Sequence, residues 1–429
     1  MKRLRTPRAS KPLGGRVTVP GDKSISHRAL LFGALASGGS RVGGLGRGAD
    51  VATTARVLQE LGVSLTNTNG VVELEGSGWD GIGEPSAPLD CGNSGTTMRA
   101  LTGVLAGARG AFVLTGDESL RRRPMLRIVA PLRQMGAAID GRAFGDRAPL
   151  FVRGSELRGV DHMLNVASAQ VKTALLLAGL RADGTTTVME PGLSRDHTER
   201  MLAAAGAPVV TGDAGISTQG GAELHSFELQ VPGDPSAAAF LVVAALLLEG
   251  SDLTITDVGL NPTRIGFVEV LRAMGGAVGT EETERRMGEP VGTIDVQASP
   301  LTATTVAPDQ VPRLIDEVPV LAVAATQAEG VTTFEGVREL RVKESDRITA
   351  IADGLRKLGG RVEVGPDSLA VEGPTPLHGG VVDSYGDHRI AMSLAIAGLL
   401  TPEKVTVKGW SAVDVSWPDF LDDLDRARA

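Results

Sequence analysis

Two cations at the start of an apolar helix are the most unusual feature of this sequence. The stretch "VPGDKSISHRALLFGALASG" (residues 19–38) places Lys23, Ser24 and Arg28 against a block of apolar side chains. The stretch predicts a helix capped by Asp22 or Ser24. Cations there oppose the helix dipole, so local stability does not explain them, whereas an anionic ligand would. The alternative is an ordinary capped helix whose cations are solvated surface charges.

Three more segments carry residues suited to binding anions. "CGNSGTTMR" (91–99) has two glycines before a helix expected from about Thr96, which favours either close approach of backbone to a ligand or a simple tight turn. "RRRPM" (121–125) offers an arginine that could clamp a carboxylate or phosphate, although a solvated charge run is the alternative. "YGDHRIAM" (385–392) adds Arg389 at another apolar helix start.

Acidic residues stand beside cations in two further segments. "RLIDEVPVLA" places Asp316 and Glu317 at the mouth of an apolar helix, where they either serve chemistry or simply cap the helix. "RVKESDRITAI" carries Lys343, Glu344 and Arg347. The spacing of Lys343 and Arg347 is that of like charges on one helix face, which is unfavourable unless an anion lies between them.

A repeat organises the chain that carries these residues. "VTVPGDKSISHRALLFGAL" (17–35) is echoed by "LQVPGDPSAAAFLVVAALL" (229–247), which indicates two related halves. A polar turn followed by an apolar helix begins near residues 21, 92, 168, 233, 316 and 386. Each unit continues with a strand, a second helix that ends on Gly, and another strand. The sequence therefore predicts six βα-rich units, three in each half.

The first helix of each unit is apolar nearly all round, so we expect it in the interior of its half. If the three helices of a half run parallel, their free N–H groups collect on one face. Six such helix ends would then meet at a cleft between the halves. The repeat thus predicts an anion-binding site at that cleft.

Composition excludes several other classes of protein. The 429 residues suffice for two or three domains, and a formal charge of −8 argues against nucleic-acid binding. The single cysteine, Cys91, excludes a disulfide framework, and the six histidines are scattered, so we expect no metal site. We expect Cys91 to be a packed residue rather than a nucleophile.

The same sequence favours a cytoplasmic protein. Its longest apolar run, 237–248, is too short to span a bilayer, and the basic start "MKRLRTPR" runs into Pro12 rather than the apolar core of a signal peptide. "GLGRGA" (44–49) fits a dinucleotide-binding fingerprint. We reject that site because we expect no long strand before it and because the acid at the right distance, Glu60, lies within the following helix.

Eight segments, in order from residue 20 to 392, together resemble one family, the 5-enolpyruvylshikimate-3-phosphate synthases, which are enolpyruvyl transferases. The segments are "PGDKSISHRAL", "GNSGTTMRAL", "RRRPM", "SAQVKTALLLAGL", "PGDPSAAAF", "LIDEVPVLA", "RVKESDR" and "YGDHRIAM". The resemblance implies an α/β fold of two domains, each built from three βαβαββ units. These would be residues 21–230, and residues 1–20 together with 231–429, the N-terminal strand completing the second domain.

The resemblance also implies an activity. The enolpyruvyl group of phosphoenolpyruvate would pass to the 5-hydroxyl of shikimate 3-phosphate, with release of phosphate and without a metal or organic cofactor. The partners would be these two small-molecule substrates, with no nucleic acid and no membrane, and we expect a monomer.

Site residues are carried over motif by motif. The shikimate 3-phosphate site would consist of Lys23, Ser24, Arg28, Ser168, Ala169, Gln170, Ser194, Asp316 and Lys343. The phosphoenolpyruvate site would consist of Lys23, Gly95, Arg123, Gln170, Arg347 and Arg389. The catalytic residues would be Asp316, Glu344, Lys23 and Lys343.

In the implied mechanism Asp316 takes or positions the proton of the attacking hydroxyl, and Glu344 protonates the phosphoenolpyruvate methylene. Because Gly95 carries no methyl group to narrow the phosphoenolpyruvate pocket, we expect the inhibitor glyphosate to bind.

The chain departs from the family pattern at a few positions. Val415 stands where many members have a phosphoenolpyruvate-binding lysine, and Glu339 stands where many have a polar residue such as Asn. "SAQ" for "SSQ" and "SRDHTERM" (194–201) also follow a variant pattern, so the departures indicate a divergent subclass.

Two other functions stay open at this point. The sister enzymes that act on UDP-N-acetylglucosamine typically have a catalytic cysteine in a loop that reads "GDESLRRRP" here. A non-catalytic phosphometabolite-binding protein would not need acids such as Asp316 and Glu344 beside its cations.

Overall fold

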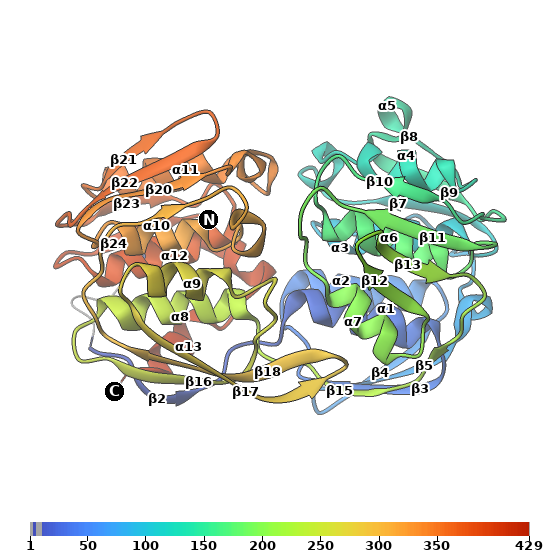
Figure 1. The fold of residues 1–429 in the computed structure, drawn as a ribbon, viewed down its shortest axis with the longest axis horizontal. Coiled ribbons are helices and arrows are strands. Elements are labelled where there is room, and N and C mark those ends of the chain that lie inside the picture. Colours follow the sequence, from blue (N-terminus) through green and yellow to red (C-terminus); the bar gives the residue numbers. More distant parts are fainter. Residues whose placement is uncertain (1–2, 6–10, 429) are drawn as a thin grey trace. The chain divides into compact units, whose positions relative to one another are not determined.

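The computed structural model describes residues 3–5 and 11–428 of the chain, and its elements follow the repeat (Figure 1). The chain divides into two compact units. The N-terminal unit comprises Gly21–Val231 and Arg285–Glu289; the C-terminal unit comprises the residues up to Pro20, Pro232–Glu284 and those from Pro290 onward. Most of the basic segment "MKRLRTPR", which we do not expect to be a signal peptide, lies outside the described residues.

Six helices, the first of each repeat, are buried on nearly all sides, as predicted. They are α1 (Lys23–Leu35), α3 (Gly95–Ala106), α6 (Ala169–Gly179), α8 (Pro235–Leu247), α10 (Val318–Ala325) and α12 (His388–Leu399). In the N-terminal unit α3 packs against α1 and α6, and in the C-terminal unit α8, α10 and α12 contact one another. Removing apolar side chains from water in this way is the main favourable contribution to folding.

The second helix of each repeat is partly exposed. These helices are α2 (Ala49–Glu60), α4 (Leu126–Gln134), α7 (His197–Ala204), α9 (Gly266–Ala273), α11 (Arg347–Lys357) and α13 (Phe420–Arg426). All but α13 are followed by a glycine in the left-handed region, for example Gly62 (φ 95°) after α2 and Gly359 (φ 93°) after α11. The predicted glycine stops are therefore confirmed for five of the six helices.

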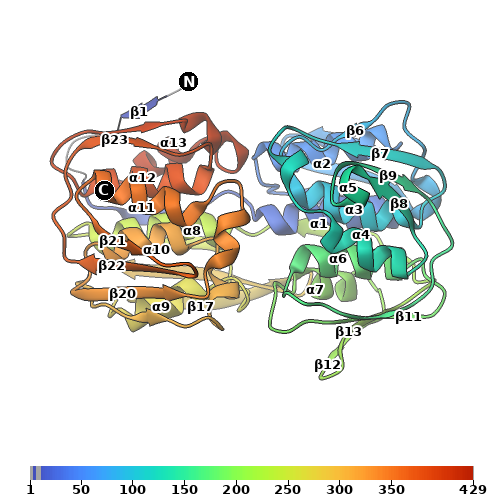
Figure 2. The same ribbon diagram turned by 90° about the horizontal axis from the view of Figure 1, so that it is seen from above.

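The strands form small sheets with a recurring order. β6 (Leu89–Asp90) is parallel to β7 (Ala111–Thr115), and β9 (Arg147–Arg153) and β8 (Ala138–Gly141) follow antiparallel. The same order joins β10 (Asp161–Met163), β11 (Thr185–Met189), β13 (Gly215–Gln219) and β12 (Val209–Gly212), and also β19 (Thr305–Val306), β20 (Gly330–Glu335), β22 (Ser368–Gly373) and β21 (Arg361–Val364). In Figure 2, β7 and β9 lie on one side of α3, and β11 and β13 on the other.

Two repeats obtain their first strand from a distant part of the chain. β2 (Gly14–Val17) pairs in parallel with β16 (Asp252–Gly259), whose sheet continues with β18 (Glu289–Gln297) and β17 (Ala277–Arg286). β14 (Leu224–His225) and β15 (Glu228–Gln230) pair in parallel with β3 (Ala36–Gly43), beside β5 (Val71–Ser77) and β4 (Ser64–Thr68). The last repeat joins β23 (Gly380–Asp383), β24 (Val405–Lys408) and β1 (Arg3–Arg5).

The structure corrects one step of the argument against a dinucleotide site. The eight-residue strand β3 directly precedes "GLGRGA", so the expectation that no long strand stands there was wrong. Glu60 does lie within a helix, as the last residue of α2. Cys91 is buried, and burial raises the pKa of its thiol to about 12, which confirms a packed residue. No helix of the described residues is long and apolar enough to cross a membrane.

His27 links the first two interior helices. It lies within α1 and is fully buried, and its Nδ1 is 2.7 Å from the Thr54 hydroxyl, which is in turn 2.6 Å from the Thr97 hydroxyl. Burial lowers the pKa of His27 from 6.5 to about 3. The folded protein therefore keeps the imidazole neutral at pH values where the unfolded chain protonates it.

We expect His27 to make the protein less stable in mild acid. Below pH 6.5 the unfolded chain binds a proton that the folded chain accepts only near pH 3, so at pH 5 the free energy of unfolding falls by about 2 kcal/mol relative to neutral pH. His27→Asn should remove this share of the pH dependence. Urea unfolding of both proteins at pH 7.5 and pH 5 measures this share. If the free energies of unfolding of the unaltered protein and of His27→Asn differ by the same amount at both pH values, the prediction is contradicted.

Candidate active site

Arg28 is an interior cation. It lies one turn into α1 and is 4% exposed. It donates to the hydroxyl of Thr198 from Nε (2.8 Å), to the hydroxyl of Thr173 from one terminal nitrogen (2.8 Å), and to the Ser24 carbonyl from the other (2.9 Å). All three acceptors are neutral, and although burial lowers the pKa of Arg28 to about 10, the guanidinium stays charged at neutral pH. For Arg28 the solvated-charge interpretation is wrong.

Lys23 has a different environment at the first position of α1. Its side chain is 24% exposed, and its ammonium group pairs with Asp50 of α2. Asp22 caps α1 by accepting from the Ile25 amide (2.9 Å). Lys23 therefore stands at the rim of the helix end, while Arg28 stands behind it.

Two guanidinium groups converge on the start of α3. A Cβ added to Gly95 would lie 2.8 Å from an Arg99 terminal nitrogen and 3.2 Å from one of Arg123. Arg123 donates to the Asn93 side chain (2.7 Å), and Arg99 donates to the Gln170 side chain (2.5 Å). Bare backbone, a helix N-terminus and two arginines together favour a bound anion.

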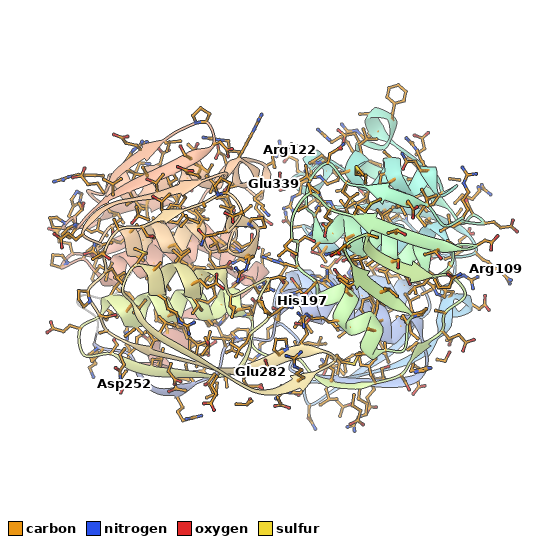
Figure 3. The ribbon with its side chains drawn as sticks, in the orientation of Figure 1. Arg109, Arg122, His197, Asp252, Glu282 and Glu339 are labelled. Atoms are coloured by element: carbon orange, nitrogen blue, oxygen red, sulfur yellow. The ribbon has the colours of Figure 1, made fainter. Side chains whose placement is uncertain are left out.

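The arginine run separates into two kinds of residue. Arg122 is 72% exposed and pairs with Glu118 at 3.1 Å, as a solvated ion pair does (Figure 3). Arg123, the next residue, reaches Asn93 and Gly95 instead. Both interpretations of the run thus apply, each to a different arginine.

The start of α6 brings the remaining predicted residues of the N-terminal unit together. Ser168 caps the helix by accepting from the Val171 amide, and its own amide donates to Glu190 Oε1 (2.9 Å). The Ser194 hydroxyl donates to Glu190 Oε2 (2.8 Å). Gln170, beside Ala169, donates to the Thr96 hydroxyl (3.0 Å) and so joins the start of α6 to that of α3.

In the C-terminal unit a buried arginine gathers three carboxylates. Arg347, at the start of α11, donates from Nε to Asp387 (2.7 Å) and from its terminal nitrogens to Asp316 (2.9 Å) and Glu344 (2.5 Å). Its side chain is 2% exposed. Burial by itself would lower the pKa of Arg347, but the three carboxylates outweigh burial and raise it above its usual value.

Asp316 lies among three cations. Besides Arg347, Lys343 Nζ is 3.8 Å from one carboxylate oxygen and an Arg389 nitrogen is 3.7 Å from the other. The anion between Lys343 and Arg347 is therefore this protein's own Asp316. Lys343 also precedes α11 and follows the 3-10 turn Arg338–Val342, which contains Glu339 (Figure 3), so the two cations do not share a helix face.

Glu317, the second acid at the start of α10, does not cap the helix with its side chain either. Glu317 Oε1 accepts from the Ser236 hydroxyl and from Arg389 at 3.4 Å. Simple capping does not describe this pair of acids. The contact with Ser236 joins the start of α10 to that of α8.

The echo of the opening stretch, residues 229–247, has no cation at the two positions that correspond to Lys23 and Arg28. Pro235 and Phe240 occupy the positions of Lys23 and Arg28 in the repeat. Arg264 supplies a guanidinium there from outside the stretch, donating to the Asp234 carboxylate (2.8 Å) and the Ser236 hydroxyl (2.9 Å). A contacting carboxylate balances that charge, in contrast to Arg28.

Two departures from the family pattern, Val415 and Glu339, lie in the C-terminal unit, whereas "SAQ" (168–170) and "SRDHTERM" (194–201) lie in the N-terminal unit. Val415 ends the 3-10 turn Trp410–Val415, and Lys408 lies in β24 opposite Asp383. In the contacts described above, the cations around Asp316 are Lys343, Arg347 and Arg389, and Lys408 is not among them.

The two units offer different chemistry. The N-terminal unit combines helix N-termini with arginines whose described acceptors are neutral, which suits anionic groups. The C-terminal unit combines carboxylates with fixed cations, which suits proton transfer next to an anion. Most of these residues were named from the sequence, but Arg99, Glu190 and Lys172, whose ammonium group is 2.8 Å from Glu190, were missed. Each lies within or just after an apolar segment, and only its contacts with distant residues reveal its place.

Comparison with known proteins gives a consistent result. The family described as EPSP synthase (3-phosphoshikimate 1-carboxyvinyltransferase) matches residues 7–424. The chain is 50% identical over 421 residues to the 3-phosphoshikimate 1-carboxyvinyltransferase of a Synechococcus species, covering 97% of this chain and 95% of the relative. It is 49% identical over 420 residues to that of Citrifermentans bemidjiense, covering 98% of both chains.

Solved structures agree with the sequence comparisons. EPSP synthase from Acinetobacter baumannii superposes with a TM-score of 0.90 at 43% identity, covering 100% of this chain and 98% of the other. The enolpyruvyl transferase NikO from Streptomyces tendae has a TM-score of 0.78 at 20% identity, covering 99% and 97%, and shows the shared fold. The predicted α/β enolpyruvyl transferase fold of six βαβαββ units is thus confirmed, and the chain belongs to the EPSP synthase family.

Proposed function

We propose that this protein transfers the enolpyruvyl group of phosphoenolpyruvate to the 5-hydroxyl of shikimate 3-phosphate and releases inorganic phosphate. The reaction belongs to the shikimate pathway of aromatic amino-acid biosynthesis. Family membership over nearly the whole chain supports the proposal. The observation that carries it is the sharing of one buried guanidinium, that of Arg347, by the two acids Asp316 and Glu344.

Both substrates carry phosphate and carboxylate groups, and the proposed sites match these charges. Lys23, Ser24, Arg28, Ser168 and Ser194 bind shikimate 3-phosphate, with Ala169, Gln170, Asp316 and Lys343 completing its site. Lys23, Gly95, Arg123 and Gln170 bind phosphoenolpyruvate together with Arg347 and Arg389. Bidentate guanidinium groups suit both kinds of anion.

These residues come from both units, so the reaction requires residues of both units to act on one pair of substrates. We therefore propose that the active site takes residues from both domains, residues 21–230 and residues 1–20 with 231–429.

The mechanism follows from general acid–base chemistry. Asp316 accepts the proton of the attacking 5-hydroxyl, and Lys343 stabilises the charge that develops beside it. Glu344 protonates the methylene carbon of phosphoenolpyruvate, which makes C2 electrophilic, and the oxygen adds there to form a tetrahedral ketal phosphate. Return of a methyl proton to Glu344 and donation of a proton from Asp316 to the leaving phosphate then break the bond from C2 to phosphate and form the enol ether product.

The buried position of Cys91 speaks against the UDP-N-acetylglucosamine alternative. A cysteine nucleophile needs an accessible thiolate, whereas burial raises the pKa of Cys91 to about 12. The acids beside the cations speak in the same way against a non-catalytic binding protein.

We further propose a cytoplasmic monomer. Phosphorylated metabolites do not cross membranes unaided, so the enzyme works in the compartment that produces them. Size-exclusion chromatography with light scattering tests the monomeric state, and a mass near 88 kDa, about twice the 44.3 kDa of one chain, would contradict it.

Phosphate release tests the function directly. The protein should liberate phosphate from phosphoenolpyruvate when shikimate 3-phosphate is present, and not when UDP-N-acetylglucosamine replaces it. Release with the UDP-sugar alone would favour the sister enzyme. Binding of both substrates without turnover would favour a binding protein.

The two proposed acids are tested by substitution. Asp316→Ala and Glu344→Gln should each lower kcat by at least about 100-fold, the usual contribution of general acid–base catalysis. Asp346→Asn is a matched control, because Asp346 pairs with Arg341 (2.8 Å) on the same segment and caps α11. Near-normal turnover of either acid variant would remove that residue from its role.

Gly95 should control the phosphoenolpyruvate pocket. We expect glyphosate to inhibit with a constant near or below the KM for phosphoenolpyruvate. Gly95→Ala places a methyl group 2.8 Å from Arg99 and displaces its guanidinium, so both constants should rise by about 10-fold, the effect of losing one good charged hydrogen bond. A glyphosate inhibition constant of the unaltered enzyme far above that KM would contradict the expected inhibition. An unchanged KM for phosphoenolpyruvate in Gly95→Ala would contradict the expected effect of the substitution.

A further inference from the structure

A buried lysine stands behind the predicted shikimate 3-phosphate residues without being one of them. Lys172 is in α6, one turn after the Ser168 cap, and its side chain is 2% exposed. Its ammonium group is 2.8 Å from Glu190 and 2.6 Å from Glu199, which are 5% and 7% exposed. A lysine this deeply buried is rare and is retained only with partners.

Glu190 connects the buried lysine to two predicted ligands of the substrate. Glu190 Oε1 accepts from the Ser168 amide (2.9 Å), and Oε2 accepts from the Ser194 hydroxyl (2.8 Å) as well as from Lys172. Ser168 and Ser194 lie on separate segments, before α6 and before α7. One carboxylate therefore sets the distance between the two segments.

A carboxylate at this place raises an electrostatic problem. A negative charge next to a phosphate-binding serine repels the ligand, unless a cation balances it. Lys172 supplies that cation from the interior side. Burial raises the pKa of Glu199, although Lys172, which is 2.6 Å from it, opposes the shift.

Stability alone does not account for the arrangement. Apolar residues of similar volume often replace a buried ion pair without loss of stability, because taking charges out of water costs as much as their attraction returns. Apolar residues would not supply the hydrogen bonds that Glu190 accepts from Ser168 and Ser194.

We propose that Lys172 and Glu190 are positioning residues of the shikimate 3-phosphate site: the buried ammonium balances the charge of Glu190, and Glu190, by accepting from the Ser168 amide and the Ser194 hydroxyl, fixes the two segments that carry these serines beside the substrate phosphate. The inference rests on the proposed function. Lys172 and Glu190 touch no substrate and act through the two serines.

Steady-state kinetics of Glu190→Gln and Lys172→Met test the inference, once the unaltered enzyme has shown turnover that depends on shikimate 3-phosphate. Absence of that turnover would refute the proposed function rather than the positioning role. In both variants the KM for shikimate 3-phosphate should rise by about 10-fold or more, the size of one charge-assisted hydrogen bond. The KM for phosphoenolpyruvate and kcat should stay within about 3-fold, and the double variant should resemble the single ones because the two residues act through one contact.

Leu175→Ala is the matched control on the same helix. Leu175 is fully buried, so this variant should lower the melting temperature and leave the KM for shikimate 3-phosphate unchanged. If Lys172→Met does not fold, Glu190→Gln, which keeps Lys172 paired with Glu199, and the charge-conserving Lys172→Arg still decide the question.

Three results would overturn the inference. The first is a KM for shikimate 3-phosphate within twofold of the unaltered enzyme in a folded Glu190→Gln variant. The second is an equal rise of KM for both substrates. The third is a double variant whose effect is the sum of two independent losses.

Discussion

The N-terminus of each interior helix must find polar partners, and the site depends on this constraint. A helix that is apolar on all sides buries its flanks, so its first unpaired N–H groups are the place where polar chemistry can enter. Side chains cap five of the six helices at this end, namely Asp22, Ser94, Ser168, Asp234 and Asp387. Contacts such as Gln170 with Thr96 and Ser236 with Glu317 join the helix ends within each unit.

The two units balance their buried charges in opposite ways. Arg28 donates to neutral oxygens, so its positive charge remains available to an anion. Arg347 is surrounded by carboxylates, so it serves to orient Asp316 and Glu344. Lys172 follows the second pattern inside the N-terminal unit, where its charge supports Glu190. The same fold repeat thus carries binding on some copies and acid–base groups on others.

Much of the fold was predictable because its signals are local. Glycine stops, polar turns and apolar runs recur with the repeat, and a helix cap depends on residues within one turn. Local signals do not predict the strands that the first repeat of each half takes from elsewhere in the chain, since β2 and β16 are separated by most of the N-terminal unit. Only the family resemblance implied that the N-terminal strand completes the second domain. The strand before "GLGRGA" was missed because its glycines and serine resemble a loop.

For the site, residue types and spacing in the chain were enough to identify the family, the helix starts that carry cations, and the acids beside them. They left open which arginine of the run turns inward, which anion lies between Lys343 and Arg347, and why Lys172 is buried. Folding answers these questions, because Arg123 meets Asn93, Asp316 meets Arg347, and Lys172 meets Glu190. Charge pairing depends on distance and burial, and for residues far apart in the chain both arise only when the helices and sheets pack.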